Sequence, residues 1–377
     1  MKHVSCSTST YGKNRHTTGT SLRIPTATYR TGLTVFHPVL VYAFCALLII
    51  TAGCSDNRPP QNLAVISDPT MGTMYNVKAV RPGGIADSEL RRIRAGIERL
   101  LVTVNDQMST YQRDSEISMF NKSGSTEWFD LSPATAEILS LATDISGRTE
   151  GAFDITVGPL VNLWGFGPEK KEASVPSDDT ITLVRQEIGY GKLSVRLSPP
   201  SAKKSTPGLY CDLAAIAKGY AVDWIAAYLD SAGVHDYLVE IGGEVRTAGC
   251  NESGEVWQVG IATPDNDLGV QTVVALRDAS MATSGDYRNF FEFDGVRYSH
   301  TIDPRTGYPV RHQLASVSVI HDSCAVADAF ATALEVLGPE EGLKLAREQN
   351  LAACFIIRTE TGLIEEMTPT FRQYLSP

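Results

Sequence analysis

The alternation of apolar and polar residues predicts helices and strands interspersed along the chain. Apolar residues recur at helical spacing in residues 88–109, on a face made by Leu90, Ile93, Ile97, Leu100 and Leu101. A second helix is predicted over residues 132–151, with Ser132 as its N-cap. A third is predicted over 211–233, with Asp212 as its N-cap and Gly233 just beyond its end.

Short apolar runs outside these helices predict strands, at residues 73–80, 236–243, 255–264, 271–277, 290–302, 315–321 and 351–358. The later runs follow one another as hairpins rather than as regular βαβ units. This order favours an α+β fold with mixed, largely antiparallel sheets packed with helices. The chain has no internal repeat of 20–50 residues.

The first 53 residues have the pattern of an export signal. A basic, Ser/Thr-rich segment leads into the apolar run Val39–Ile50 and then "TAGC". This resembles the processing box of a bacterial lipoprotein, in which Cys54 becomes the lipidated first residue, although Thr51 replaces the usual leucine. An uncleaved hydrophobic anchor is the alternative. Either interpretation predicts an exported protein on the periplasmic side of a bacterial membrane, and the sequence does not distinguish the inner from the outer membrane.

We divide the chain into a signal peptide over residues 1–53, a polar tether over 54–70 and a folded domain over 71–377. Four cysteines remain after Cys54, at positions 211, 250, 324 and 354. They are widely spaced in mostly apolar sequence, without a CxxC pair or a Cys/His cluster, so we expect buried thiols rather than a zinc site.

The charge distribution argues against a nucleic-acid partner. The chain has a formal net charge of −10, but residues 1–53 carry five basic and no acidic residues. The remainder has 28 basic and 43 acidic residues, a net charge of −15. Nucleic-acid binding requires a positive surface. The GxGxxG, P-loop, HExxH and GxSxG motifs are also absent.

An acidic residue interrupts the most apolar predicted helix, "AVADAFATAL" (325–334). Asp328 and Thr332 lie one turn apart on the same face and could present two oxygens to Mg²⁺ or Ca²⁺. Alternatively, Asp328 caps a nearby loop and Thr332 bonds back to a helix carbonyl.

Three further stretches carry candidate chemistry, each with an ordinary structural alternative. Asp212 and Lys218 in "DLAAIAKG" could hold a phosphate at a helix start, or be a simple cap and a surface lysine. His300, next to the "DPRTG" turn, could be catalytic or merely structural. The Gly- and aromatic-rich segment 149–168 could form a tight turn or one wall of a planar-ligand site.

Taken together, these stretches resemble the ApbE family of flavin transferases, the FAD:protein FMN transferases. The matching motifs occur in family order: "MGTMYNV", "MSTYQRDSEISMFN", "GAFDITVGPLVNLWGFGP", "DLAAIAKGYAVD", "EIGGEVRTAG", "ATSGDYRNFF", "SHTIDPRTG" and "AVADAFATAL". They extend from Met71 to near the C-terminus. The lipoprotein-like signal agrees with this resemblance, because these enzymes act outside the cytoplasm.

The resemblance implies a reaction in which FMN passes from FAD to a Ser or Thr hydroxyl of an acceptor protein and AMP leaves. The acceptor would be a subunit of a membrane redox complex with a Ser/Thr-Gly-Ala-Thr motif. Two alternatives remain at this stage: an FAD pyrophosphatase that yields FMN and AMP, and a lipoprotein that binds FAD without turnover.

The resemblance also assigns roles to residues. Asp328, Thr332 and the main-chain carbonyl of Ala215 would bind Mg²⁺, and His300 would be the general base. Eight residues would line the FAD site: Met71, Tyr111, Ala152, Phe153, Asp154, Asp212, Lys218 and Ile302.

Overall fold

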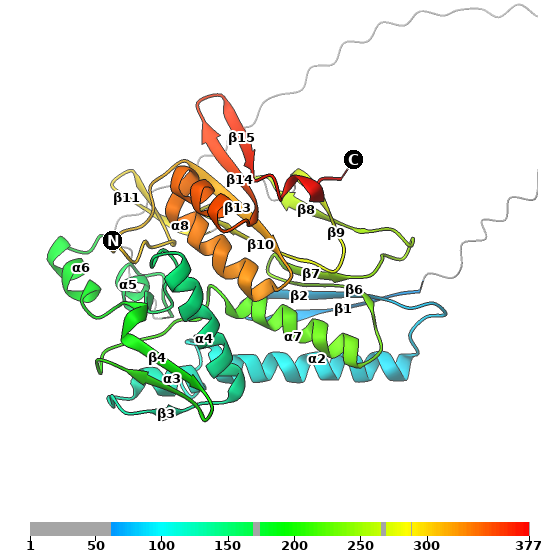
Figure 1. Ribbon diagram of the computed structural model, residues 1–377, viewed down its shortest axis with the longest axis horizontal. Coiled ribbons are helices and arrows are strands. Elements are labelled where there is room, and N and C mark those ends of the chain that lie inside the picture. Colours follow the sequence, from blue (N-terminus) through cyan, green and yellow to red (C-terminus); the bar gives the residue numbers. More distant parts are fainter. Residues whose placement is uncertain (1–61, 169–173, 265–268, 288, 377) are drawn as a thin grey trace, which may run out of the picture. The chain divides into compact units, whose positions relative to one another are not determined.

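One eight-stranded sheet organises the fold in a computed structural model that describes residues 62–168, 174–264, 269–287 and 289–376 (Figure 1). Every strand in it is antiparallel to its neighbours. Its strands, in spatial order, are β1 (Leu63–Thr70), β2 (Thr73–Val80), β6 (Asp236–Ile241), β7 (Glu244–Ala248), β10 (Ser280–Gly285), β13 (Leu314–His321), β14 (Ala352–Thr359) and β15 (Gly362–Met367). The described residues all belong to one unit, Arg58–Pro377.

Three smaller sheets accompany the large one among the described residues. One is three-stranded, with β3 (Phe129–Asp130), β5 (Pro200–Lys204) and β4 (Leu193–Leu197). The other two are ribbons, formed by β8 (Trp257–Ala262) with β9 (Val270–Leu276) and by β11 (Phe290–Phe293) with β12 (Val296–Ser299). Short 3₁₀ turns, η1 and η2, occupy Tyr190–Lys192 and Arg372–Tyr374.

The helices are α2 (Asp87–Met108), α3 (Glu116–Lys122), α4 (Pro133–Arg148), α5 (Gly158–Leu163), α6 (Asp178–Arg185), α7 (Ala217–Ser231) and α8 (Cys324–Glu348). In Figure 1, α8 crosses β10 and β13, and α7 lies between α8 and α2, as their mutual contacts also show. Ser132 caps α4, where its hydroxyl accepts a hydrogen bond from the Thr135 N–H, as the sequence predicts. These helices, packed with mostly antiparallel sheets, confirm the predicted α+β class.

The main core lies between the large sheet and α2, α4, α7 and α8. Its members include Ile93, Ile97 and Leu101 of α2 and Phe330 of α8. The apolar face predicted for residues 88–109 thus faces this core. Three of the four cysteines of the described residues are buried and Cys250 is partly buried; all four are unpaired, as expected.

Three local predictions differ from the structure. Residues 63–70, predicted as part of the tether, form β1, which pairs with β2 along its whole length. The helix predicted from residue 211 begins only at Ala217, so Asp212 is not its N-cap. The run 290–302 is two strands, because Asp294 and Gly295 both adopt positive φ and turn the chain into a ribbon.

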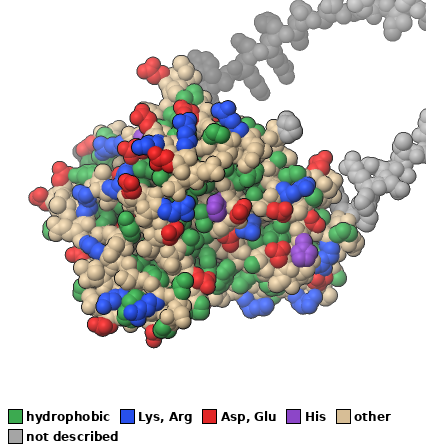
Figure 2. Space-filling model, viewed as in Figure 1, with side chains coloured by type: hydrophobic (Ala, Val, Ile, Leu, Met, Phe, Trp, Pro, Cys, Tyr) green, Lys and Arg blue, Asp and Glu red, His purple; other side chains and the backbone are tan. Residues whose placement is uncertain are grey.

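The predicted signal peptide and Cys54 lie outside the described residues, as does the rest of the tether up to residue 61. Within the described part, no helix has the length and hydropathy to cross a bilayer. On the face shown in Figure 2, acidic and basic side chains of the described residues are interspersed.

Candidate active site

A cavity of about 710 Å³ lies where α8, the start of α7, the 149–168 segment and the end of the β11–β12 ribbon meet. Its volume falls within the usual range for small-molecule sites. Eleven of the twelve predicted site residues line it: Tyr111, Ala152, Phe153, Asp154, Asp212, Ala215, Lys218, His300, Ile302, Asp328 and Thr332. Residues far apart in the sequence are therefore brought together.

The twelfth residue, Met71, lines a neighbouring cavity of about 650 Å³. The two cavities share Tyr111, Asp212, Ala214 and Lys218 in their walls. Met71 lies in the β1–β2 turn with a φ of 47°. The Tyr111 side chain is largely exposed (69%), so its ring is available for stacking with a planar ligand.

Two carboxylates flank one ammonium group at the start of α7. Lys218 Nζ lies 2.7 Å from Glu244 Oε1 and 3.9 Å from Asp328 Oδ2. Asp328 Oδ2 also accepts a hydrogen bond from the Gly219 N–H at 3.1 Å. The Asp328 and Glu244 carboxylates are buried. Asp328 therefore contacts the first turn of α7 and does not cap a loop, which was the structural alternative for this residue.

Burial and mutual contact shift the pKa values of this cluster. Burial raises the pKa of Glu244 to about 7; Asp328 adds to this rise and Lys218 opposes it. Burial likewise raises the pKa of Asp328, opposed by Lys218 and the Gly219 N–H. Burial alone would lower the pKa of Lys218, but Asp328 and Glu244 outweigh it and raise that pKa. With both carboxylates ionised, the cluster is net negative.

The donor atoms around Asp328 suit a hard cation. The Thr332 hydroxyl lies 3.3 Å from the Ser284 hydroxyl, and both residues line the cavity with Asp328 and Ala215. Glu244 Oε2 is buried and has no hydrogen-bond partner among the described residues. One carboxylate oxygen is therefore unpaired in the same cavity as these hydroxyl and carboxylate oxygens, the kind of ligand that a hard cation prefers. The described residues include no group of three His, Cys, Asp or Glu side chains that could hold a metal by themselves. Hydroxyl, main-chain or ligand oxygens would have to complete the shell.

His300 lies directly after β12, half-buried at the cavity wall. Its Nδ1 lies 2.9 Å from the Asn289 carbonyl oxygen, which can only accept, so Nδ1 carries the proton and Nε2 keeps its lone pair. Burial lowers the pKa of His300, partly offset by the Asn289 carbonyl and by Asp286. The imidazole is therefore neutral at pH 7 and can accept a proton at Nε2.

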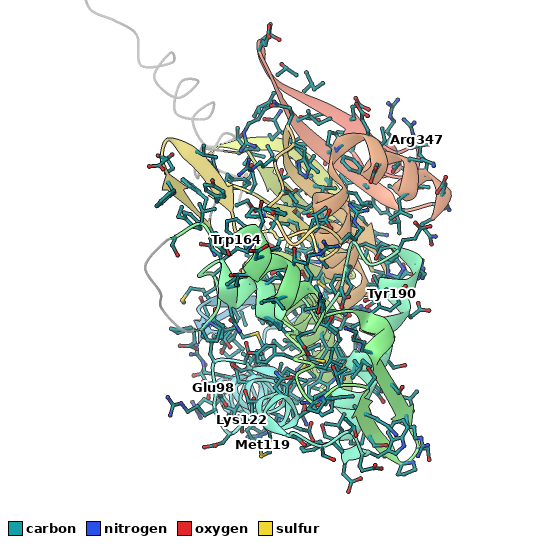
Figure 3. All side chains as sticks on the ribbon, turned by 90° about the vertical axis from the view of Figure 1, so that its left-hand side faces the viewer. Glu98, Met119, Lys122, Trp164, Tyr190 and Arg347 are labelled. Atoms are coloured by element: carbon teal, nitrogen blue, oxygen red, sulfur yellow. The ribbon has the colours of Figure 1, made fainter. Side chains whose placement is uncertain are left out.

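An aromatic cluster holds the strand that leads to His300. Trp164 stacks on Tyr298 with ring centroids 5.5 Å apart, and Tyr298 stacks on Phe291 at 5.1 Å. Trp164 Nε1 also donates a 2.9 Å hydrogen bond to the Gly307 carbonyl, which fixes the predicted "DPRTG" turn. Figure 3 shows Trp164 where the helices of this region meet the β11–β12 ribbon.

Asp154 shapes the 149–168 segment from inside. Its Oδ1 accepts hydrogen bonds from the Thr156 N–H at 2.8 Å and the Thr156 hydroxyl at 2.7 Å, and Oδ2 accepts one from the Tyr190 N–H at 2.8 Å. Ala152 and Phe153, immediately before it, are buried. The carboxylate thus organises the loop, and the segment forms one wall of the cavity.

The segment that precedes α7 is held at two points. Asn121 Nδ2 donates to the Cys211 carbonyl, and the Cys211 N–H donates to Asn121 Oδ1, both at 2.7 Å. Asp212 Oδ1 accepts a 2.9 Å hydrogen bond from the Ala214 N–H. Asp212 therefore closes a turn before the helix, and this turn presents Ala215 and Lys218 to the cavity.

Two buried carboxylates in the cavity wall, Glu244 and Glu335, are absent from the sequence-based site. Glu244 follows two glycines in the "EIGGEV" motif, which the sequence identified without assigning it a role. Glu335 lies seven residues after Asp328 in the same apolar helix. The reasoning that singled out Asp328, an acid among apolar residues at helical spacing, applies equally to Glu335.

Comparisons with known proteins agree with this geometry. The model of the ApbE family matches residues 71–355. The chain is 46% identical over 332 residues to an FAD:protein FMN transferase of Vibrio cholerae, covering 88% of this chain and 97% of that one. It is 37% identical over 341 residues to the FAD:protein FMN transferase of Escherichia coli K12, covering 88% and 96%.

Solved structures share the fold. The flavin transferase ApbE from Vibrio cholerae superimposes with a TM-score of 0.77 at 44% identity, covering 84% of this chain and all of that one. The apo form of the Pseudomonas stutzeri flavinyl transferase ApbE gives a TM-score of 0.76 at 39% identity, covering 83% and 96%.

Proposed function

The chain belongs to the ApbE family, and from that membership we propose that it transfers FMN from FAD to a Ser or Thr hydroxyl of an acceptor protein. The observation that carries the proposal is that the Lys218–Asp328–Glu244 cluster and His300, with its unprotonated Nε2, line the same cavity. A net-negative cluster beside hydroxyl oxygens suits a divalent cation that would face a pyrophosphate, and a neutral imidazole suits a hydroxyl nucleophile.

In the proposed reaction, the acceptor oxygen bonds to the phosphorus of the FMN half of FAD. The bond from that phosphorus to the bridging oxygen breaks, and AMP leaves with the electron pair. The proton of the acceptor hydroxyl passes to Nε2 of His300. The Asn289 carbonyl hydrogen-bonds to Nδ1–H and stabilises the imidazolium that results.

We assign the cation site to Asp328, Thr332 and the main-chain carbonyl of Ala215, with Mg²⁺ as the ion. A bound Mg²⁺ would neutralise charge on the pyrophosphate, the usual means of catalysing phosphoryl transfer. Lys218 adds a fixed positive charge to the same wall, and Glu244 holds it in place. Tyr111 offers its exposed ring to a planar part of FAD.

The proposed acceptor is a subunit of a membrane redox complex that carries a Ser/Thr-Gly-Ala-Thr motif. The proposed location is the periplasmic side of a bacterial membrane, with a lipid on Cys54 as the anchor. The export-like pattern of residues 1–53 supports this location, and the family membership supports the acceptor chemistry.

The test is to incubate the protein with FAD and Mg²⁺, with and without an acceptor protein that carries the motif. AMP release and flavin fluorescence of the acceptor on a denaturing gel are followed together. AMP release with a fluorescent acceptor band is the expected result. AMP without a labelled band would instead indicate a pyrophosphatase, and FAD binding without AMP would indicate a binding protein.

A further inference from the structure

Glu335 is the most completely buried acid in the cavity wall, and no established part of the site uses it. The residue has 0% exposure, yet it lines the 710 Å³ cavity. Neither of its carboxylate oxygens has a hydrogen-bond partner among the described residues. Because a buried polar group without a partner costs free energy, such a group calls for a ligand or water.

The main chain at Glu335 is held in place independently of its side chain. Helix α8 has a kink at Gly338, and Pro339 has no N–H with which to bond the Glu335 carbonyl. His312 Nε2 donates to that carbonyl at 2.7 Å instead. The hydrogen bond from His312 therefore involves the main chain of Glu335 and leaves its carboxyl group unpaired.

The surroundings of Glu335 favour the neutral form of its carboxyl group. Burial raises its pKa well above the usual range, and Asp286 raises it further. Arg358 opposes this shift, but its guanidinium is paired with both oxygens of Asp286 at 2.9 and 3.0 Å. A neutral carboxyl group presents one hydrogen-bond donor beside one acceptor.

Glu335 lies further along α8 than both side chains assigned to the cation, three residues beyond Thr332. Asp328, Thr332 and Glu335 share one face of α8, and Glu335 is seven residues, or about 10 Å, along the axis from Asp328. Its neighbour Val336 also lines the cavity. In a nucleotide, the sugar separates the ring from the phosphate. A ligand whose phosphate lies near Asp328 would therefore place its ring further along the cavity.

We propose that Glu335 is a specificity-determining residue whose carboxyl group pairs with a ring edge of FAD that offers a donor next to an acceptor. This inference rests on the proposed function. Both rings of FAD have such an edge: adenine has an amino group beside a ring nitrogen, and isoalloxazine has an N–H between two carbonyls. A site that hydrogen-bonds such an edge rejects ligands that lack it.

Two uncharged variants test the proposal. Glu335→Gln keeps one donor and one acceptor, whereas Glu335→Met keeps the unbranched shape and removes both. We expect Glu335→Met to weaken FAD binding by about 10–100-fold and Glu335→Gln to stay within about threefold, measured by flavin fluorescence. In transfer assays, KM for FAD should rise in Glu335→Met while kcat is retained.

Thermal unfolding of the ligand-free variants separates a ligand role from a structural one. Because Glu335→Met removes an unpaired buried acid, its Tm should be equal to or higher than that of the wild type. Titration with AMP and FMN separately identifies the ring: the half of FAD whose affinity falls is the one that Glu335 contacts. Unchanged FAD affinity in Glu335→Met, or an equal loss in Glu335→Gln, would overturn the proposal. Wild-type protein that does not bind FAD would refute the proposed function itself.

Discussion

The charge cluster at the start of α7 shows how three residues give one wall of the cavity its charge. Asp328 and Glu244 are buried acids that Lys218 only partly compensates. Burying such groups costs free energy unless they are paired, which agrees with the proposed cation at this wall. The three groups therefore depend on one another, and replacing any one changes the other two.

Replacing Asp328 by asparagine tests the cation assignment. The amide would keep an oxygen that accepts from the Gly219 N–H, so we expect Asp328→Asn to fold. Because the negative charge is lost, the variant should lose Mg²⁺-dependent turnover at Mg²⁺ concentrations that saturate the wild type. Isothermal titration with Mg²⁺ in the presence of FAD measures the loss. In the wild type, burial raises the pKa of Asp328, and cation binding requires the ionised form, so Mg²⁺ affinity should rise with pH. Unaltered Mg²⁺ dependence in the variant would remove Asp328 from the site.

Replacing His300 by glutamine tests the general base. We expect His300→Gln to bind FAD normally and to transfer FMN about 10²–10⁴-fold more slowly, the usual contribution of such a base. Since the neutral imidazole is the active form and burial lowers its pKa, the wild-type rate at saturating Mg²⁺ should be flat at pH 7–8. The rate should fall only below the ordinary histidine range. A rate in His300→Gln that equals the wild type would exclude this role.

At the scale of single residues, membership of the site was easier to predict than the hydrogen-bond and ion-pair partners of each residue. The resemblance named eleven residues that line one cavity and a twelfth in the cavity next to it. Sequence alone could not show that Glu244 pairs with Lys218, because these residues come from different elements whose approach depends on the packing of α7 against the sheet. Asp154 was assigned to ligand binding, and the structure adds its three hydrogen bonds to the loop.

Among the elements, the close approach of α7 and α8 decides the geometry of the cluster. A Cβ at Gly219 would lie 2.4 Å from the Cys324 carbonyl oxygen and 2.8 Å from the Ala325 Cα. Both are main-chain atoms, so the helices could not adjust by rotating a side chain. Ala325 is buried at this contact, and its small side chain is compatible with the close approach.

Gly219→Ala should therefore destabilise the protein by about 1–3 kcal/mol, as overpacking does, and weaken FAD binding through displacement of Lys218. Chemical denaturation and FAD titration measure the two effects. Gly147→Ala in α4 is the matched control: no atom lies within 4 Å of its added Cβ, and alanine is the better helix former. It should stabilise by about 0.5–1 kcal/mol and leave FAD binding unchanged. Equal effects of the two substitutions would contradict the close-contact argument.

Helix and strand types followed from periodicity, whereas boundaries depended on tertiary contacts. The run 211–233 has one continuous helical pattern, but the main chain of Cys211 makes both of its hydrogen bonds with Asn121 outside the helix, and the helix starts at Ala217. β1 was missed because residues 62–70 mix polar and apolar positions. An edge strand is exposed on its open side, which weakens the alternation that would reveal it.

Considered as a whole, the chain carries its predicted targeting signal and its cavity residues in separate stretches of sequence. The match to the ApbE family begins at Met71, and all cavity residues lie at or after it. The predicted lipid attachment site, Cys54, precedes β1 in the chain. Membrane attachment and FMN transfer should therefore be separable by mutation.

Cys54→Ser tests this separation. Without the thiol, no lipid can be attached, and the apolar run 39–50 is too short to span a bilayer comfortably as a helix. We expect the variant to move from the membrane pellet to the soluble fraction of a bacterial host. The wild-type protein released with detergent and the soluble variant should then show equal AMP release when each is given FAD and a soluble acceptor. Labelling with a radioactive fatty acid should disappear in Cys54→Ser and persist in Cys250→Ser, a control thiol in the folded domain. A variant that stays in the membrane pellet would show that the apolar run itself is the anchor.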